Sequence, residues 1–148
     1  MTVTTGRRDL VANRWEPFVH VFRYEGQDLT GATIIGSVRD RRDGGFERVA
    51  LATVGSVATE GFTIVSVANE DIDFGGDVGV VNVPVSTISM RINEATMEAM
   101  GTATLAAGAQ EAGDDGNIWW DKQITPTGGV KYRSLEGTFT LKAGATGS

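Results

Sequence analysis

Few residues in this 148-residue chain have the types and spacing that catalysis or metal binding requires. The one histidine, His20, lies in the aromatic run PFVHVFRYEG, where an imidazole usually packs or hydrogen-bonds as part of the fold. Cysteine is absent, so a zinc site would need at least two carboxylates beside His20, and no such spacing occurs in the sequence. The sequence also lacks a nucleophile elbow, a phosphate-binding loop and a dinucleotide-binding fingerprint. We therefore predict no catalytic, cofactor-binding or metal-binding residues, and a protein that is not an enzyme.

The acidic segment NEDIDFGGD, residues 69–77, comes nearest to a cation site, because calcium favours several carboxylate oxygens. It lacks the glycine and the final glutamate at the offsets that a calcium-binding loop requires. We interpret it, like the pair Asp114 and Asp115, as a solvated acidic turn. A glycan hydrolase would need two positioned carboxylates, and the sequence supports no such pair.

The charge balance argues against a nucleic-acid partner. With 13 basic and 19 acidic residues the net charge is −6, whereas phosphate backbones are bound by clustered Lys and Arg. The basic runs at residues 7–9 and 39–43 contain balancing aspartates. Because there is no run of about 18 apolar residues and no apolar signal-peptide stretch, we also expect no membrane segment.

The elements that must position any site are predicted to be short strands. A count of 20 glycines and 3 prolines, with a strong Val, Thr and Ile bias, is typical of strands joined by glycine turns. Alternation of apolar and polar residues predicts strands over 31–40 and 86–92, with weaker candidates over 61–68 and 78–85. Pro84 cannot donate to a strand ladder, so it indicates a sheet edge or a strand end.

The strand predicted over residues 18–24 is unusual because both of its faces are largely apolar. Phe18 and Phe22 lie on one face, and Val19 and Val21 lie on the other. We expect the core to cover the first face and a neighbouring element or subunit to cover the second.

Turns and one short helix complete the prediction. The runs Asp43-Gly44-Gly45 and Pro-Thr-Gly-Gly at 126–129 indicate hairpin turns. A helix over 94–100, capped by Asn93, would close one end of a core, and residues 101–116 read as a long exposed loop. This pattern predicts a single all-β domain over residues 1–148, an antiparallel sandwich or barrel with one short helix.

The segment IWWDKQI places Trp120 and Ile124 on the inward face of a strand and Trp119 on the outward face. Trp119 is then either a sheet-surface residue partly covered by the long loop or an interface anchor. Lys122 falls on the inward face, so we expect it to reach solvent or to lie near the rim of the sheet. The predicted core includes Val38, Ile88, Met90, Ile92, Trp120, Ile124, Phe139 and Leu141.

The N-terminal arm, residues 1–16, contains apolar residues without a helical or strand period. Such a segment is costly to leave in water, so we expect it to dock on a neighbouring subunit with Trp15 as a buried anchor, helped by the loop at 101–116. The alternative is an arm that folds back on its own sandwich. The predicted interface residues are Leu10, Val11, Arg14, Trp15, Glu16 and Trp119.

Three segments in order carry a family resemblance. They are DLVANRWEPFVHVFRYEGQDLTGATIIGSVRD at residues 9–40, STISMRINEATMEAM at 86–100, and IWWDKQITPTGGVKYRSLEGTFTLKAG at 118–144. Together they resemble small tail-region structural proteins of tailed bacteriophages and prophages. They are also similar to the N-terminal domain of siphophage baseplate upper proteins.

This resemblance implies an immunoglobulin-like β-sandwich on the virion that connects a receptor-binding or fibre component to the tail. It implies that Gly31 sets the turn in DLTGAT, with Asp28 or Thr30 bonded to the local backbone. WWD would begin a late strand and residues 137–139 would belong to the last one. The family pattern leads us to expect an apolar residue at position 122, where this sequence has a lysine.

We therefore expect a non-enzymatic virion structural protein, a tail, baseplate or fibre-attachment adaptor that assembles in the cytoplasm of the bacterial host. Its expected partners are other phage structural proteins and copies of itself, with no nucleic acid, membrane or cofactor. A capsid decoration protein is one alternative. A carbohydrate-binding module is another, with Trp15, Trp119 and Tyr132 as possible sugar platforms.

Overall fold

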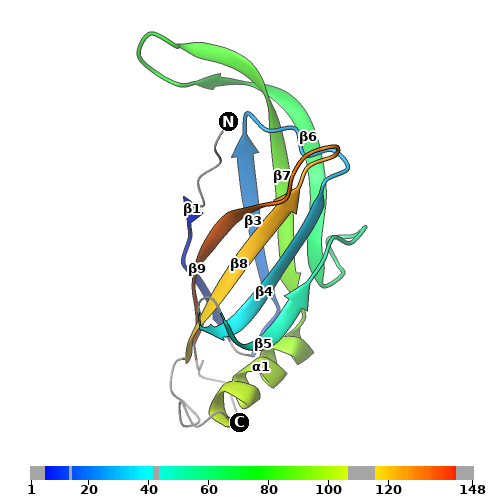
Figure 1. Cartoon of the computed structure of the whole chain (residues 1–148), viewed down its shortest axis with the longest axis vertical. Helices are drawn as coiled ribbons and strands as arrows, with labels where there is room; N and C mark the ends of the chain where they lie inside the picture. The colour runs from blue at the N-terminus through cyan, green and yellow to red at the C-terminus, as the bar shows by residue number, and fades with distance from the viewer. Residues whose placement is uncertain (1–5, 14, 42–43, 107–115, 143–148) are drawn as a thin grey trace.

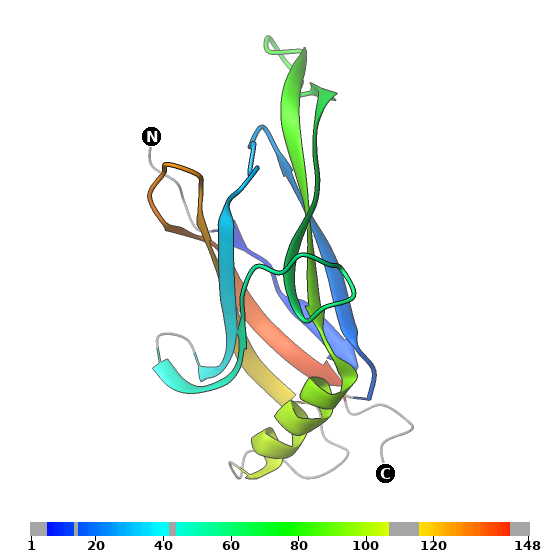
Figure 2. The same ribbon diagram turned by 90° about the vertical axis from the view of Figure 1, so that its right-hand side faces the viewer.

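The computed structural model describes residues 6–13, 15–41, 44–106 and 116–142. It confirms an all-β chain with one helix: two sheets face each other as the layers of a sandwich, and the helix lies across one end (Figures 1 and 2). The elements in chain order are β1 (Gly6–Arg7), β2 (Leu10–Asn13), β3 (Phe18–Glu25), β4 (Thr33–Arg41), β5 (Gly44–Leu51), β6 (Gly61–Asp73), β7 (Val80–Ile92), α1 (Glu94–Ala106), β8 (Gly116–Thr125) and β9 (Tyr132–Lys142).

The strand order is that of an immunoglobulin-like sandwich. The larger sheet runs β1-β9-β8-β4-β5, with β2 also paired to β9, and the smaller sheet runs β3-β7-β6. In immunoglobulin terms β3, β7 and β6 take the places of strands B, E and D, while β9, β8, β4 and β5 take those of G, F, C and C′. The immunoglobulin-like fold expected from the resemblance is therefore present.

The predicted core is confirmed in full. Each of its eight residues is at most 2% exposed, because the inward positions of both sheets meet between the layers. Met97 and Met100 of α1 are also buried and belong to the same cluster, so the helix closes one end of the sandwich as predicted.

An aromatic pair joins the two sheets. The rings of Phe22 on β3 and Trp120 on β8 are stacked, with their centroids 5.7 Å apart. Antibody domains link the same two strands, B and F, by a disulfide. The Trp120 indole Nε1 also donates to the Arg8 carbonyl oxygen at 2.7 Å, which ties the N-terminal segment to the core.

The DLTGAT turn has the conformation that the resemblance implied. Gly31 has a φ of +71°, a value that favours glycine. The Ala32 amide donates to the Leu29 carbonyl oxygen at 3.0 Å, and the Thr30 amide donates to Asp28 Oδ1 at 3.0 Å. Local hydrogen bonds therefore set the entry into β4.

Both predicted hairpins are present. The β4–β5 ladder reaches Arg41 opposite Gly44, and the Gly129 amide donates to the Pro126 carbonyl oxygen between β8 and β9. After the second turn, residues 132–142 form the single strand β9. The ladder shifts register at Ser134, which adds one residue opposite the β8 strand and leaves β9 continuous.

The N-terminal arm differs from its prediction. Strands β1 and β2 pair in parallel with β9, and Leu10 and Ala12 are buried within the domain. The expectation of a segment without a strand period is wrong, because Val11, although apolar, points outward and hides the alternation in LVAN. This part of the arm folds back on its own sandwich.

The predicted loop at 101–116 is also corrected. Helix α1 continues to Ala106 and β8 begins at Gly116; residues 107–115 lie outside the described residues. Gly101 suggested the end of the helix. One glycine costs only about 1 kcal/mol relative to alanine, and the Ala and Leu residues that follow favour helix.

Strands β6 and β7 are longer than predicted, with 13 residues each, and they project beyond the sandwich as a two-stranded ribbon (Figure 1). Pairing of β3 with β7 ends at Glu25 opposite Val85, so residues 69–84, the ribbon, have no third strand. Pro84 lies just past this point, and its carbonyl oxygen accepts the Gly26 amide at 2.7 Å. Strand β7 is central in its sheet, but Pro84 lies just past the point where β3 ends. The N–H that proline lacks is therefore not needed for the ladder with β3.

Candidate functional site

The structure separates the predicted interface residues. Leu10 lies in the core, whereas Val11 is 60% exposed on the outer face of the larger sheet. Trp119 is half-buried on that face, since Val11 pairs with Thr140 and Trp119 pairs with Thr138 two residues earlier on β9. Val11 and Trp119 therefore share this surface of the sheet.

The remaining predicted interface residues lie after β2. Glu16 is exposed and accepts a hydrogen bond from the Asn13 side-chain amide, while Trp15 is half-buried. Arg14 lies outside the described residues. Whether Trp15 anchors a neighbouring subunit stays a prediction.

Trp119 is covered on one side by an arginine. The Arg7 guanidinium lies 5.3 Å from the centre of the indole ring and also pairs with Asp9 at 3.2 Å. Asp9 in turn accepts the Thr138 amide at 3.0 Å, a hydrogen bond that lowers the pKa of this carboxyl. The N-terminal segment thus partly covers the tryptophan, a role that the sequence pattern assigned to the loop at 101–116.

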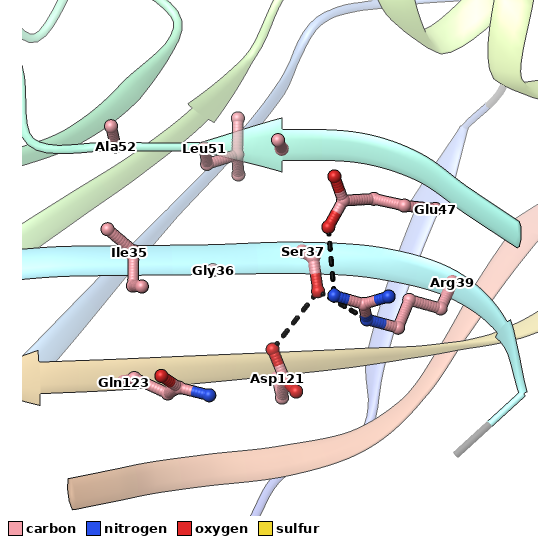
Figure 3. Close-up of a pocket in the computed structure, with 10 residues that line it drawn as sticks. Ile35, Gly36, Ser37, Arg39, Glu47, Leu51, Ala52, Asp121 and Gln123 are labelled. Carbon is pink, nitrogen blue, oxygen red and sulfur yellow. Dashed lines mark hydrogen bonds and ion pairs between the residues drawn. The ribbon is translucent and has the colours of Figure 1, made fainter. Parts of the chain in front are cut away.

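A shallow hollow of about 320 Å³ lies on the outer face of the larger sheet, over β4, β5 and β8 (Figure 3). Apolar side chains and backbone form much of its floor, and polar side chains lie along one end. Its lining residues are Ile35, Gly36, Ser37, Arg39, Glu47, Ala50, Leu51, Ala52, Asp121 and Gln123.

The polar end of the hollow is a connected network. Arg39 Nη2 donates to Glu47 at 2.9 Å and its Nε donates to the Ser37 hydroxyl at 3.0 Å, while that hydroxyl donates to Asp121 at 3.2 Å (Figure 3). Asp121 also lies 3.9 Å from the Arg133 guanidinium. Both carboxylates are therefore charge-paired and fixed. Such a network can orient polar groups of a partner, and surface pairs of this kind add only ~0–1 kcal/mol of stability.

Lys122 lies on the opposite side of the same sheet and contradicts its prediction. The side chain has 0% exposure, and no described residue accepts a hydrogen bond from its ammonium nitrogen. It neither reaches solvent nor lies at the rim of the sheet, because the aromatic side chains of β3 and β6 cover it.

The space for Lys122 comes from Gly36, its partner on β4. A Cβ at Gly36 would come within 2.8 Å of the Phe62 ring, so the missing side chain lets this ring pack close to the strand. The Lys122 ammonium then lies 3.3, 4.8 and 5.8 Å from the ring centres of Phe22, Tyr24 and Phe62. Burial lowers the pKa of Lys122 to about 6.

The same burial affects the neighbouring residues of β3. Burial raises the pKa of Tyr24 to about 12, and its hydroxyl lies 3.2 Å from the Ser134 hydroxyl. His20 packs between Phe18 and Phe22, with ring centres 6.2 and 4.7 Å away, and burial lowers its pKa. The prediction of a packed histidine is confirmed by these ring contacts.

The acidic segment at 69–77 forms the tip of the ribbon. Asp73 Oδ1 accepts the Gly75 amide at 2.8 Å, and Asp71 Oδ1 accepts the Asn82 side-chain amide at 2.8 Å. Among the described residues, no group of three His, Cys, Asp or Glu side chains is placed to hold a metal ion. Asp73 is thus used in a local turn bond and Asp71 in a cross-strand bond.

No helix in the described part of the chain is long and apolar enough to cross a membrane. Comparison of the sequence with known protein families and with characterised proteins finds no match.

Proposed function

We propose that this chain is a non-enzymatic structural component of a tailed-phage virion, located at the tail or baseplate, where it attaches a fibre or receptor-binding component. Its partners are other structural proteins of the particle and further copies of itself. The protein assembles onto the particle in the cytoplasm of the bacterial host.

The observation that carries this proposal is the way in which the three resembling segments fold. The first contributes β2, β3 and β4, the second contributes most of β7 and the start of α1, and the third contributes β8 and β9. They form one immunoglobulin-like sandwich, the fold that the resemblance implies. The segments that carry the resemblance thus supply strands of both sheets, and this supports the proposed adaptor role.

The exposed surfaces also fit an assembly component. The carboxylates of the hollow are already paired with arginines, while valines are exposed on the opposite sheet. Protein–protein interfaces commonly combine an apolar central surface with polar and charged groups at the rim.

The proposal is tested on intact particles. Purified virions of the phage or prophage that encodes this chain should contain it by mass spectrometry, and a cryo-EM map should place the sandwich at the tail or baseplate. Density on the capsid shell would instead support the decoration alternative. Absence of the chain from purified particles, with the protein present in the lysate, would overturn the proposal.

Carbohydrate binding remains a second candidate because the half-buried Trp119 shares the outer face of its sheet with the polar hollow. A sugar platform needs an open aromatic face, and Arg7 lies over this ring. Tyr132, another possible platform, donates its hydroxyl to Gln27 at 2.8 Å. Binding to host cell-wall glycans that is lost in Trp119→Ala and kept in Val130→Ala would favour this function.

A further inference from the structure

The outer face of the smaller sheet carries the exposed valines of β3. Val19 is 51% exposed and Val21 is 56% exposed, although both lie in the middle of a regular strand. The sequence predicted that this face would be covered, and no described helix or strand lies against β3 on this side (Figure 2). The outward positions of this face are Val19, Val21, Arg23, Glu25, Thr63, Ser66, Ala68, Glu70, Val85, Thr87, Ser89 and Arg91, of which Thr63, Val85 and Ser89 are buried.

This face continues without a break onto the ribbon. Glu70 pairs with Val83 and Ile72 pairs with Val81, so these residues lie on the same side as Val19 and Val21. Val81 is 37% exposed, and Ile72 and Val83 are half-buried. An isolated two-stranded ribbon is only marginally stable in water, so a partner against this side would stabilise it.

We infer that a second copy of this chain packs its own smaller sheet against this face, ribbon included. This inference deepens the proposed function, on which it rests for the expectation of a multi-copy component. It names the surface through which the copies meet.

The charges on the face favour a second copy over a charged partner. Its outward charged residues are two arginines, Arg23 and Arg91, and two glutamates, Glu25 and Glu70, so the face is neutral in a chain of net charge −6. Two copies can meet here without the like-charge repulsion that their other surfaces impose. A strongly basic or acidic partner would gain nothing from a neutral face.

The geometry of the charges also suits a two-fold contact. Arg23 binds both carboxylate oxygens of Glu70, at 2.9 and 3.0 Å, at the point where the sandwich meets the ribbon. Because a two-fold axis brings the same patch against itself, basic and acidic groups on one face can meet their opposites on the other. Val19 and Val21 lie on one side of this ion pair, and Val81 and Val83 of the ribbon lie on the other side.

The size of the face is near the lower limit for a specific interface. With strands of 13, 13 and 8 residues, a rise of about 3.3 Å and a strand spacing of about 4.8 Å give a footprint of roughly 500 Å². This approaches the ~800 Å² per partner of a standard interface, before contacts at the rim are added.

The first test measures the mass of the purified protein by sedimentation equilibrium, without any particle present. The wild-type chain should show a dimer mass, and the double variant Val19→Glu/Val21→Glu should weaken the dimer at least about tenfold. Val130→Glu is the matched control, since Val130 is 86% exposed in the turn between β8 and β9. A monomeric wild-type chain, or equal weakening by both variants, would overturn the inference.

A second test works even if the double variant fails to fold. The chain has no cysteine, so Val21→Cys can carry a single spin label, and Val130→Cys provides the control. Two packed sheets lie ~10 Å apart, so Val21 labels on paired copies should be separated by roughly 10–25 Å, with no defined short distance for Val130. Absence of the Val21 distance at concentrations where a dimer mass is seen would overturn the assigned surface. A dimer that forms in solution while particles lack the protein would refute the proposed function alone.

Discussion

The ammonium nitrogen of Lys122 lies 3.3 Å from the centre of the Phe22 ring, in a core where the lysine has no exposed surface. Two effects oppose each other at this position. Contact with aromatic faces favours the charged form by about 2 kcal/mol, whereas removing an ammonium from water costs several kcal/mol. Desolvation is the larger effect, so the pKa falls to about 6 and the amine is neutral at neutral pH.

Replacing this lysine by an apolar residue of similar length should stabilise the domain. Lys122→Met keeps the contacts with the aromatic rings and removes the cost of burying an amine without an acceptor. We expect the free energy of unfolding at neutral pH to rise by about 2–4 kcal/mol, measured by urea denaturation. Lys131→Met, at an exposed position, is the control and should change stability by less than about 0.5 kcal/mol. A destabilised Lys122→Met variant would show that the amine makes a favourable interaction.

The pH dependence of stability has a defined sign. The folded pKa of Lys122 is about 6, below the ordinary lysine value of 10.5 that applies to the unfolded chain. Between these values only the unfolded chain binds the proton, so stability rises with pH. Between about pH 7 and about pH 9 the wild type should gain up to ~1.4 kcal/mol per pH unit, and Lys122→Met should lose this slope. If the free energy of unfolding changed with pH in the same way in both proteins, the lowered pKa would not belong to Lys122.

Acid should destabilise the domain for a related reason. Burial lowers the pKa of His20 below its ordinary value of 6.5, so the folded state holds this ring in its neutral form. Stability is present above the unfolded pKa and is lost as pH falls below it, because the unfolded chain then takes up the proton. A His20→Phe variant should lose less stability than the wild type between about pH 7 and about pH 5, as followed by thermal unfolding.

Gly137 is expected to be essential for docking of the N-terminal strands. A Cβ at this position would collide with the Arg8 carbonyl oxygen, which also accepts the Trp120 indole hydrogen bond. Gly137→Ala should cost about 1–3 kcal/mol and speed hydrogen exchange at the Thr138 amide, which donates to Asp9. Gly55→Ala is the control, because no atom lies within 4 Å of the position that its methyl group would take. Unchanged exchange at Thr138 would refute this account.

The two adjacent tryptophans should respond very differently to truncation. Trp120→Ala empties a fully buried site between the sheets and should cost ~3–5 kcal/mol. Trp119→Ala removes a half-buried ring from the outer face and should cost about 1 kcal/mol or less. Chemical denaturation of both variants checks the difference, and equal costs would show that Trp119 also supports the fold.

Much of the fold follows from alternation along single strands. Ile88, Met90 and Ile92 are buried as their spacing predicted, and Trp120 and Trp119 take opposite faces as expected. These positions could be predicted because each pattern is local, and a shift by one residue would turn every apolar side chain toward water.

The parts that the sequence did not predict depend on contacts between distant segments. Lys122 is buried because Gly36, 86 positions earlier, leaves room for the Phe62 ring, and no pattern within one strand contains this information. The pairing of Leu10 with Phe139 likewise joins residues from opposite ends of the chain. Local patterns offer no means of choosing between an arm docked on its own sandwich and one docked on a neighbour.

The pairing of the first strands with the last strand has a consequence for synthesis on the ribosome. Among the strands of this domain β1 and β2 leave the exit tunnel first, yet the strand with which they pair, β9, is the last of them to be made. The segment with β1 and β2 must therefore wait, with Leu10 exposed, until all the other strands of the domain have emerged. Such long-range pairing delays folding because the entropy of closing the loop is lost before any contact forms. Closure of the larger sheet therefore waits until β9 has left the tunnel, and chains truncated before β9 should be substrates for chaperones and proteases.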